Sequence, residues 1–81
     1  NYIVEDNELQ IRAAQLANTL ANGPRKALQL MKENLIEAAT SEFLEALDAE
    51  ALRLVKSADS ADHKEAVRAF IEKREPKFNK V

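Results

Sequence analysis

The chain has 81 residues, which is enough for one small domain at most. A domain of this size buries only about 60–65% of the surface that its unfolded chain exposes, so it supports one thin core. The net charge of −2 gives no general case for binding nucleic acid. The sequence has no cysteine, which excludes disulfides and thiolate chemistry, and its single histidine leaves few ligands for a zinc site.

No apolar run approaches the ~20 residues that a membrane-spanning helix needs. Residues 1–6 lack the basic start and the apolar stretch of a signal peptide. We therefore expect a cytoplasmic protein with no membrane partner. Asn1 is not an initiator residue, and the only methionine, Met31, lies inside a helical pattern. We expect the chain to begin partway through a longer protein.

The first elements are a short β-prone segment and a helix. Residues 2–4 are apolar and resemble the end of a strand. Apolar residues then recur at spacings of three and four, which predicts a helix over about residues 7–22, capped by Asp6 or Asn7. We expect Gly23 to end this helix in the left-handed conformation, which glycine adopts without penalty.

Three further helices follow with short connections, which predicts an all-α fold in a single domain over residues 1–81. The second covers about residues 24–39 and begins at a proline. The third covers about 42–57, and the fourth covers about 61–74 and ends before Pro76. The candidate N-caps are Thr40 or Ser41 for the third helix and Ser60 for the fourth.

The titratable side chains that suit catalysis or metal binding are His63 and a run of three acids. His63 has no partner on the same helical face at the spacing that acid–base chemistry requires, so we expect it on the surface. Glu42, Glu45 and Asp48 share a spacing of three, which a solvated helix face explains more simply than a metal site. We therefore predict neither a catalytic residue nor a metal ligand in this chain.

The C-terminal segment is basic. From Lys73 onward it has four basic residues and one acidic residue. Either this is a solvated tail, or it is a small site for an anion. Phe70 precedes Lys73 by three residues, so an aromatic surface beside an ammonium group could take a flat base together with a phosphate. Cations at a helix C-terminus are also favoured by the helix dipole alone, which leaves both alternatives open.

Residues 60–78 resemble the C-terminal signature of the enoyl-CoA hydratase/isomerase (crotonase) family. The signature is Ser-x-Asp, then Ala-Phe-x-Glu-Lys-Arg, a proline and a terminal Phe, and it corresponds to Ser60 through Phe78. Glu8-Leu9, Gly23-Pro24 and Glu45-Ala46-Leu47 resemble the family's preceding helices in the same order. Ala66 departs from the pattern, since the family usually has glycine there, and this puts the local helix packing in doubt.

The resemblance implies several properties of this chain. The family's acid/base carboxylates and oxyanion hole belong to an N-terminal core, which would lie upstream of these helices. The C-terminal helices of the family build trimers, and pairs of trimers often build hexamers. Matching positions imply that Phe70 and Lys73 lie near the CoA of a neighbouring subunit. Arg74 matches the motif but receives no ligand role.

The sequence therefore predicts a helical segment for self-association that also forms the edge of a CoA site. The parent protein would hydrate or isomerise a CoA thioester, which is a substrate and not a cofactor, and this chain alone would be inactive. The alternative is a self-contained helical module that binds a partner helix in a groove and has no catalytic role.

Overall fold

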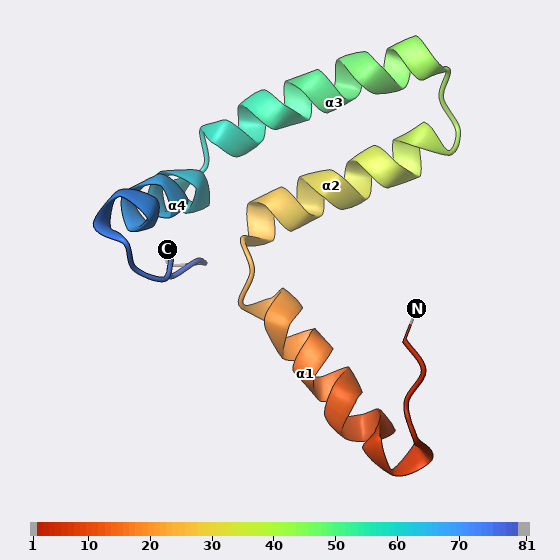
Figure 1. Ribbon diagram of the computed structural model, residues 1–81. Helices are drawn as coiled ribbons and strands as arrows, with labels where there is room; N and C mark the ends of the chain where they lie inside the picture. Colours follow the sequence, from red (N-terminus) through yellow and green to blue (C-terminus); the bar gives the residue numbers. More distant parts are fainter. Residues whose placement is uncertain (1, 80–81) are drawn as a thin grey trace.

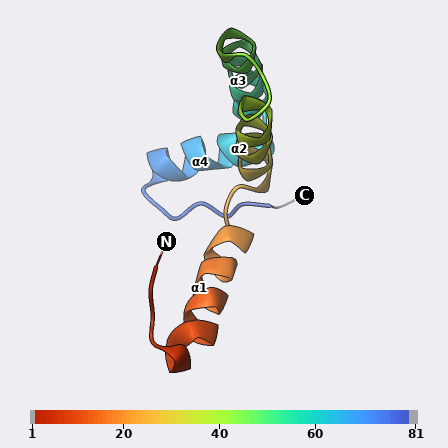
Figure 2. The same ribbon diagram turned by 90° about the vertical axis from the view of Figure 1, so that its right-hand side faces the viewer.

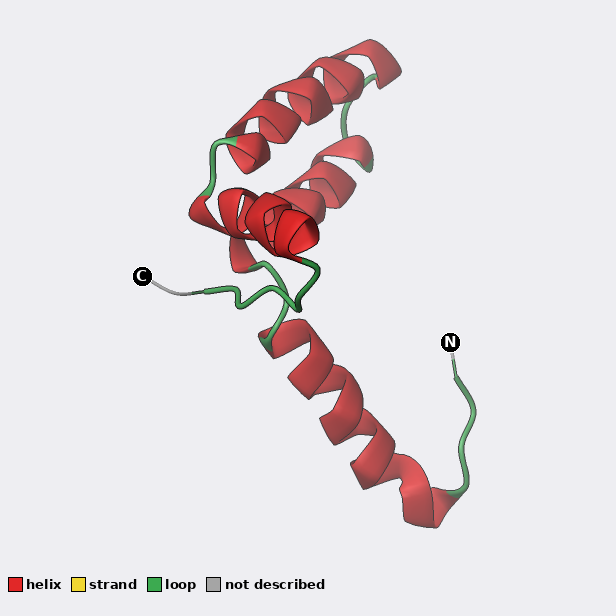
Figure 3. Cartoon of the chain, turned by 60° about the vertical axis from the view of Figure 1, so that its left-hand side comes forward, coloured by secondary structure: helices red, strands yellow, loops and turns green. Residues whose placement is uncertain are grey.

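The computed structural model describes residues 2–79, and these form an all-α structure (Figure 1). Helices and loops alone make up the described residues in Figure 3, which confirms the predicted fold class. A 3-10 turn precedes four α-helices. Their bounds are η1 Asp6–Glu8, α1 Leu9–Ala21, α2 Arg25–Ala38, α3 Phe43–Ala58 and α4 Ala61–Glu72.

The main packing unit is the antiparallel hairpin of α2 and α3 (Figure 1). Arg53 of α3 joins the two helices through its guanidinium group. It donates to Asn34 Oδ1 at 3.0 Å, lies 3.4 Å from Glu33 Oε2 and forms an ion pair with Glu37. These bonds favour the charged form of the arginine, so its pKa is raised, chiefly by the hydrogen bond to Glu37.

Helix α1 extends away from the other helices, as the two perpendicular views show (Figures 1 and 2). It packs against η1 and makes at most marginal contact with α2, α3 and α4. The radius of gyration is 16.1 Å, whereas a compact chain of this length has about 12 Å. The chain by itself is therefore open, with one arm that lacks a packing partner among residues 2–79.

The N-terminal segment differs from its prediction. Residues 2–4 form no strand, because no other extended segment among the described residues pairs with their backbone. Instead, the guanidinium of Arg12 lies 5.6 Å from the centre of the Tyr2 ring, an aromatic–cation contact. Neither predicted cap is correct, since Asp6 and Asn7 belong to η1 and α1 begins at Leu9 without a side-chain cap.

The turn between α1 and α2 also forms differently. Gly23 does not adopt a left-handed conformation, so the predicted reason for this glycine was wrong. Glycine is needed here because neighbouring atoms lie close to its Cα: a Cβ at this position would lie 3.1 Å from Leu28 Cδ1 and 3.3 Å from Leu20 O. Asn22 is the C-cap residue of α1, and its Nδ2 donates to Asn18 O at 2.9 Å. Pro24 is the N-cap residue, and α2 begins one residue later than predicted.

The starts of α3 and α4 test the two other predicted caps. Glu42, and not Thr40 or Ser41, is the N-cap residue of α3, and it makes no side-chain capping bond. Ser60 caps α4 as predicted, because its Oγ accepts from His63 N at 3.1 Å. The same hydroxyl donates to Ser57 O at 2.6 Å, so one side chain joins the end of α3 to the start of α4.

The core is small. Among the described residues, Leu30 is 4% exposed and Ala69 is 1% exposed, and these are the only buried apolar side chains. Large apolar residues on all four helices remain exposed, including Leu16 of α1, Leu35 of α2 and Phe43 of α3. None of the helices over residues 2–79 combines the length and the apolar character that crossing a membrane requires.

Candidate functional site

The end of α4 carries both residues that the sequence assigned to a ligand. α4 ends at Glu72, two residues earlier than predicted. Lys73 has φ 54° and ψ 46°, which is the left-handed conformation. Its N–H donates to Phe70 O at 3.3 Å, and the next N–H, that of Arg74, donates to Ala69 O at 3.0 Å. These two bonds form a Schellman motif, in which the left-handed position is usually glycine.

Arg74 is fixed by ion pairs immediately beyond this turn. Its Nη1 lies 2.6 Å from Glu65 Oε1 and its Nη2 lies 3.2 Å from Oε2, which is a two-pronged contact. Its Nε also donates to Glu72. The same Glu65 Oε1 accepts from Lys77 N at 3.1 Å. Glu65 therefore holds the chain on both sides of Pro76.

These contacts determine the electrostatics of the turn. The hydrogen bond from Arg74, followed by the backbone N–H of Lys77, lowers the pKa of Glu65 to about 2. The carboxylates of Glu65 and Glu72 in turn raise the pKa of Arg74. Arg74 is thus engaged with protein groups, and no ion pair of Lys73 occurs among residues 2–79.

Phe70 and Lys73 are both on the surface. Phe70 is 85% exposed, which is unusual for an aromatic side chain on the apolar stripe of a helix. Lys73 is also exposed. Their relation is not that of two residues one helical turn apart, because Lys73 lies beyond the end of α4 in the left-handed conformation. The sequence pattern did not reveal this change of direction, since lysine is an ordinary helical residue.

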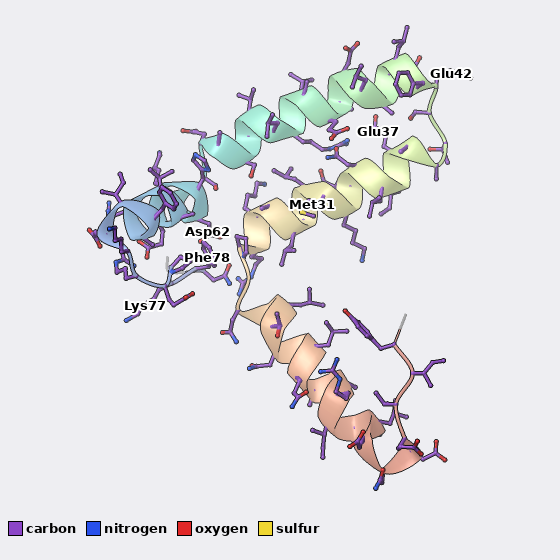
Figure 4. The ribbon with its side chains drawn as sticks, viewed as in Figure 1. Met31, Glu37, Glu42, Asp62, Lys77 and Phe78 are labelled. Atoms are coloured by element: carbon purple, nitrogen blue, oxygen red, sulfur yellow. The ribbon has the colours of Figure 1, made fainter. Side chains whose placement is uncertain are left out.

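The tail after α4 returns to the turn between α1 and α2, and Asn79 makes that contact. Its side chain accepts from Arg25 N at 3.0 Å and donates to Gly23 O at 2.8 Å. Its own N–H donates to Asp62 Oδ1 at 2.9 Å. Figure 4 shows Asp62 of α4 beside this tail, with Lys77 and Phe78 along it. Asn79 therefore supplies the acceptor that α2 lacks in its own N-cap, Pro24.

No local sequence pattern indicates the role of Asn79. The bonded groups lie 54 and 56 positions away along the chain, so only the folded backbone brings them together. Asn79 has φ 63°, and asparagine tolerates this left-handed conformation better than most residues. Its Nδ2 also donates to Ala21 O at 3.4 Å, so this one asparagine bonds to the end of α1, the start of α2 and α4.

The other candidate residues lie apart from this site. His63 is exposed in the first turn of α4, as predicted. Glu42 is the N-cap residue of α3, so the three acids of the predicted 42–48 face do not all belong to one helix. Among residues 2–79, no group of three metal-ligating side chains converges.

An apolar groove runs between α2 and α3, with a volume of about 550 Å³. Leu30, Met31, Leu47, Ala51 and Leu54 line it, and Asn34, Asp48 and Arg53 are among its polar residues. The composition of this groove suits a protein contact or an apolar ligand.

The model of the family described as enoyl-CoA hydratase/isomerase matches residues 1–81, the whole chain. The chain belongs to the enoyl-CoA hydratase/isomerase family. Among its relatives is 1,2-epoxyphenylacetyl-CoA isomerase of Escherichia coli (strain K12), which is 38% identical over 76 residues. That match covers 94% of this chain and 29% of the relative. The chain thus spans under a third of the length of this family member.

Family membership favours one of the two sequence interpretations. The match includes the four helices and the turn that carries Phe70 and Lys73. A self-contained helical module that is unrelated to this family would not be expected to match its model over the whole chain. The enoyl-CoA hydratase/isomerase interpretation therefore takes precedence over the alternative of an unrelated interaction module.

Proposed function

We propose that this chain serves as a helical self-association segment and as the edge of a CoA site in an enzyme that hydrates or isomerises CoA thioesters. The observation that carries the first part is the exposure of large apolar residues on every helix, while Leu30 is the only large apolar side chain buried among residues 2–79. Exposed apolar surfaces of this extent are typical of protein interfaces.

Self-association gives these surfaces a partner. α1 has no buried residue, and the groove between α2 and α3 is open. Burying such faces against further copies removes apolar area from water, at about 25 cal/mol per Å². The family resemblance favours a trimer or a hexamer as the assembly of the whole protein. The other faces would then cover its catalytic core.

Sedimentation velocity over a range of concentrations tests this assembly. We expect the 81-residue chain to form oligomers as its concentration rises. Replacement of Leu35, which is 75% exposed, by glutamate should weaken association. Replacement of the exposed, polar Gln10 by glutamate provides the same charge change as a control and should have less effect. A strict monomer at every concentration would contradict the proposed association.

The second part of the proposal assigns a ligand to the end of α4. The relative that carries CoA in its name supports a CoA thioester as the ligand class. Phe70 offers an exposed aromatic face, and Lys73 offers an ammonium group that is free of ion pairs within residues 2–79. Phe70 would pack near the CoA moiety, and Lys73 would neutralise a phosphate.

A titration with CoA, followed by NMR of the backbone amides, tests this assignment. We expect shifts that concentrate on residues 70–77 and that weaken in Lys73→Ala. Lys32→Ala removes the same charge from the exposed surface of α2, so it controls for net charge. Equal weakening in both variants would exclude a specific role for Lys73.

Catalysis itself is assigned to the rest of the parent protein. Among residues 2–79 the carboxylates that lie close together are bound to arginines, as Glu65 and Glu72 are to Arg74, and the exposed imidazole of His63 makes no side-chain hydrogen bond. The oxyanion hole that stabilises an enolate-like state would lie in the family's core. Turnover of a short enoyl-CoA by the 81-residue chain at enzyme-like rates would overturn this division.

A further inference from the structure

The conformation of Lys73 is held by contacts that lie outside its own side chain. Its left-handed backbone is disfavoured for any residue with a Cβ, and a Schellman motif normally has glycine there. A disfavoured conformation persists only when its surroundings impose it, and such positions are often functional. Two contacts at this turn impose it, and both involve Glu65.

The first contact is the two-pronged pair between Glu65 and Arg74, with distances of 2.6 Å and 3.2 Å. Arg74 directly follows Lys73, and its N–H closes the Schellman motif onto Ala69 O. The guanidinium binds the Glu65 carboxylate through both Nη atoms, so the pair restricts the direction of the chain after Lys73. The turn cannot unwind without separating these two groups.

The second contact is the hydrogen bond from Lys77 N to Glu65 Oε1, at 3.1 Å. It anchors the chain on the far side of Pro76, so the segment from Arg74 to Lys77 is bound at both ends to the Glu65 carboxylate. Glu65 is only 18% exposed, which fits a side chain that is enclosed by the turn. Lys73 directly precedes this segment, and its ammonium group, like the side chains of Glu75 and Lys77, has no ion pair among the described residues.

We propose that Glu65, acting through Arg74, is a positioning residue that holds Lys73 in the left-handed turn and so directs its ammonium group to the phosphate of the ligand. This inference rests on the proposed function for its ligand, but the positioning of Lys73 can be tested without any ligand. The two adjacent basic residues then have different roles. Arg74 stabilises the turn, and the turn exposes the ammonium group of Lys73.

Glu75 offers a matched control. Its side chain makes no hydrogen bond or ion pair among residues 2–79, and it lies in the same turn. Glu65→Gln and Glu75→Gln raise the net charge equally. If charge alone governs anion binding, both variants should bind an anion more tightly. If Glu65 positions Lys73, Glu65→Gln should bind more weakly in spite of its added positive charge.

The conformation of Lys73 is measured first, by NMR of the 81-residue chain without ligand. A positive φ brings the amide and α protons of one residue close together, which gives a strong intraresidue NOE. We expect this NOE at Lys73 in the unmodified chain and in Glu75→Gln, and its loss in Glu65→Gln. Arg74→Lys keeps the charge but removes the guanidinium fork, so it should also lose the NOE. Arg74→Lys therefore still tests the positioning of Lys73 if Glu65→Gln fails to fold.

Binding is measured second, with CoA as the probe. We expect Glu65→Gln to bind about threefold more weakly than the unmodified chain, as the loss of one well-placed surface charge allows. Retention of the left-handed NOE in both Glu65→Gln and Arg74→Lys would overturn the positioning role. Loss of the NOE in a chain that binds no CoA would leave the positioning role standing and refute the proposed ligand.

Discussion

Replacement of Leu30 by alanine measures how much of this chain's stability comes from its own core. Leu30 is 4% exposed and lies between α2 and α3. Complete burial of a leucine contributes about 1.5–3 kcal/mol, and truncation to alanine adds a cavity cost where neighbours cannot move in. The adjacent groove is open, so solvent and side chains can fill the space. We therefore expect a loss of about 2 kcal/mol, at the lower end of measured values.

Leu35→Ala is the matched control, since it makes the same change on the same helix at a side chain that is 75% exposed. In the isolated chain it should lower the free energy of unfolding by less than about 0.5 kcal/mol. Under the proposed self-association, Leu35 becomes covered, so its effect should grow with protein concentration. The effect of Leu30 should be present at every concentration.

Urea unfolding followed by circular dichroism, at low and high protein concentration, separates these contributions. The reasoning about the core is refuted if both variants lose the same free energy at low concentration. That result would mean that the hairpin of α2 and α3 does not form in the isolated chain. An effect of Leu35 that stays constant with concentration would instead contradict association through this face of α2.

Three further predictions concern the caps, the turn and the tail. Ser60→Ala should lower the unfolding free energy by about 1 kcal/mol, because it removes the α4 cap; calorimetry measures this, and no change would show that the cap contributes nothing. Lys73→Gly should be neutral or stabilising by up to about 1 kcal/mol, since glycine tolerates the left-handed conformation; a clear loss in chemical denaturation would contradict the turn. Asn79→Ala should free α1 and raise the radius of gyration in small-angle scattering, whereas an unchanged value would show that other contacts hold the arm.

The pH dependence of the turn at Glu65 follows from its lowered pKa. The folded-state pKa of about 2 lies below the ordinary value of 4.5, so the folded state favours the ionised carboxylate. The resulting stability is fully present above about pH 4.5 and is lost as the pH falls toward 2. The unmodified chain should therefore lose stability progressively as the pH falls from about 4.5 toward 2. Glu65→Gln should abolish this part of the pH dependence, and an identical acid profile for both chains would contradict it.

The sequence by itself determined the number of helices, their order and the family. Apolar spacing of three and four, one glycine and two prolines were sufficient for the helices, because helices are specified by local periodicity and local breaks. The family followed instead from the resemblance of residues 60–78 to its C-terminal signature. The Ser60 cap was also predictable, since its partner is three residues away. Local signals misplaced the start of α1 and the role of Gly23, where backbone geometry and neighbouring side chains decided the outcome.

Only the tertiary structure revealed how the end of α4 is built. Asn79 contacts groups more than 50 positions away, and Glu65 binds Arg74 and Lys77 across a turn whose direction depends on one left-handed residue. Sequence spacing placed Phe70 and Lys73 on one helical face, but α4 ends between them. A local pattern carries no information about where a chain returns after a helix, because that path is fixed by hydrogen bonds between distant residues.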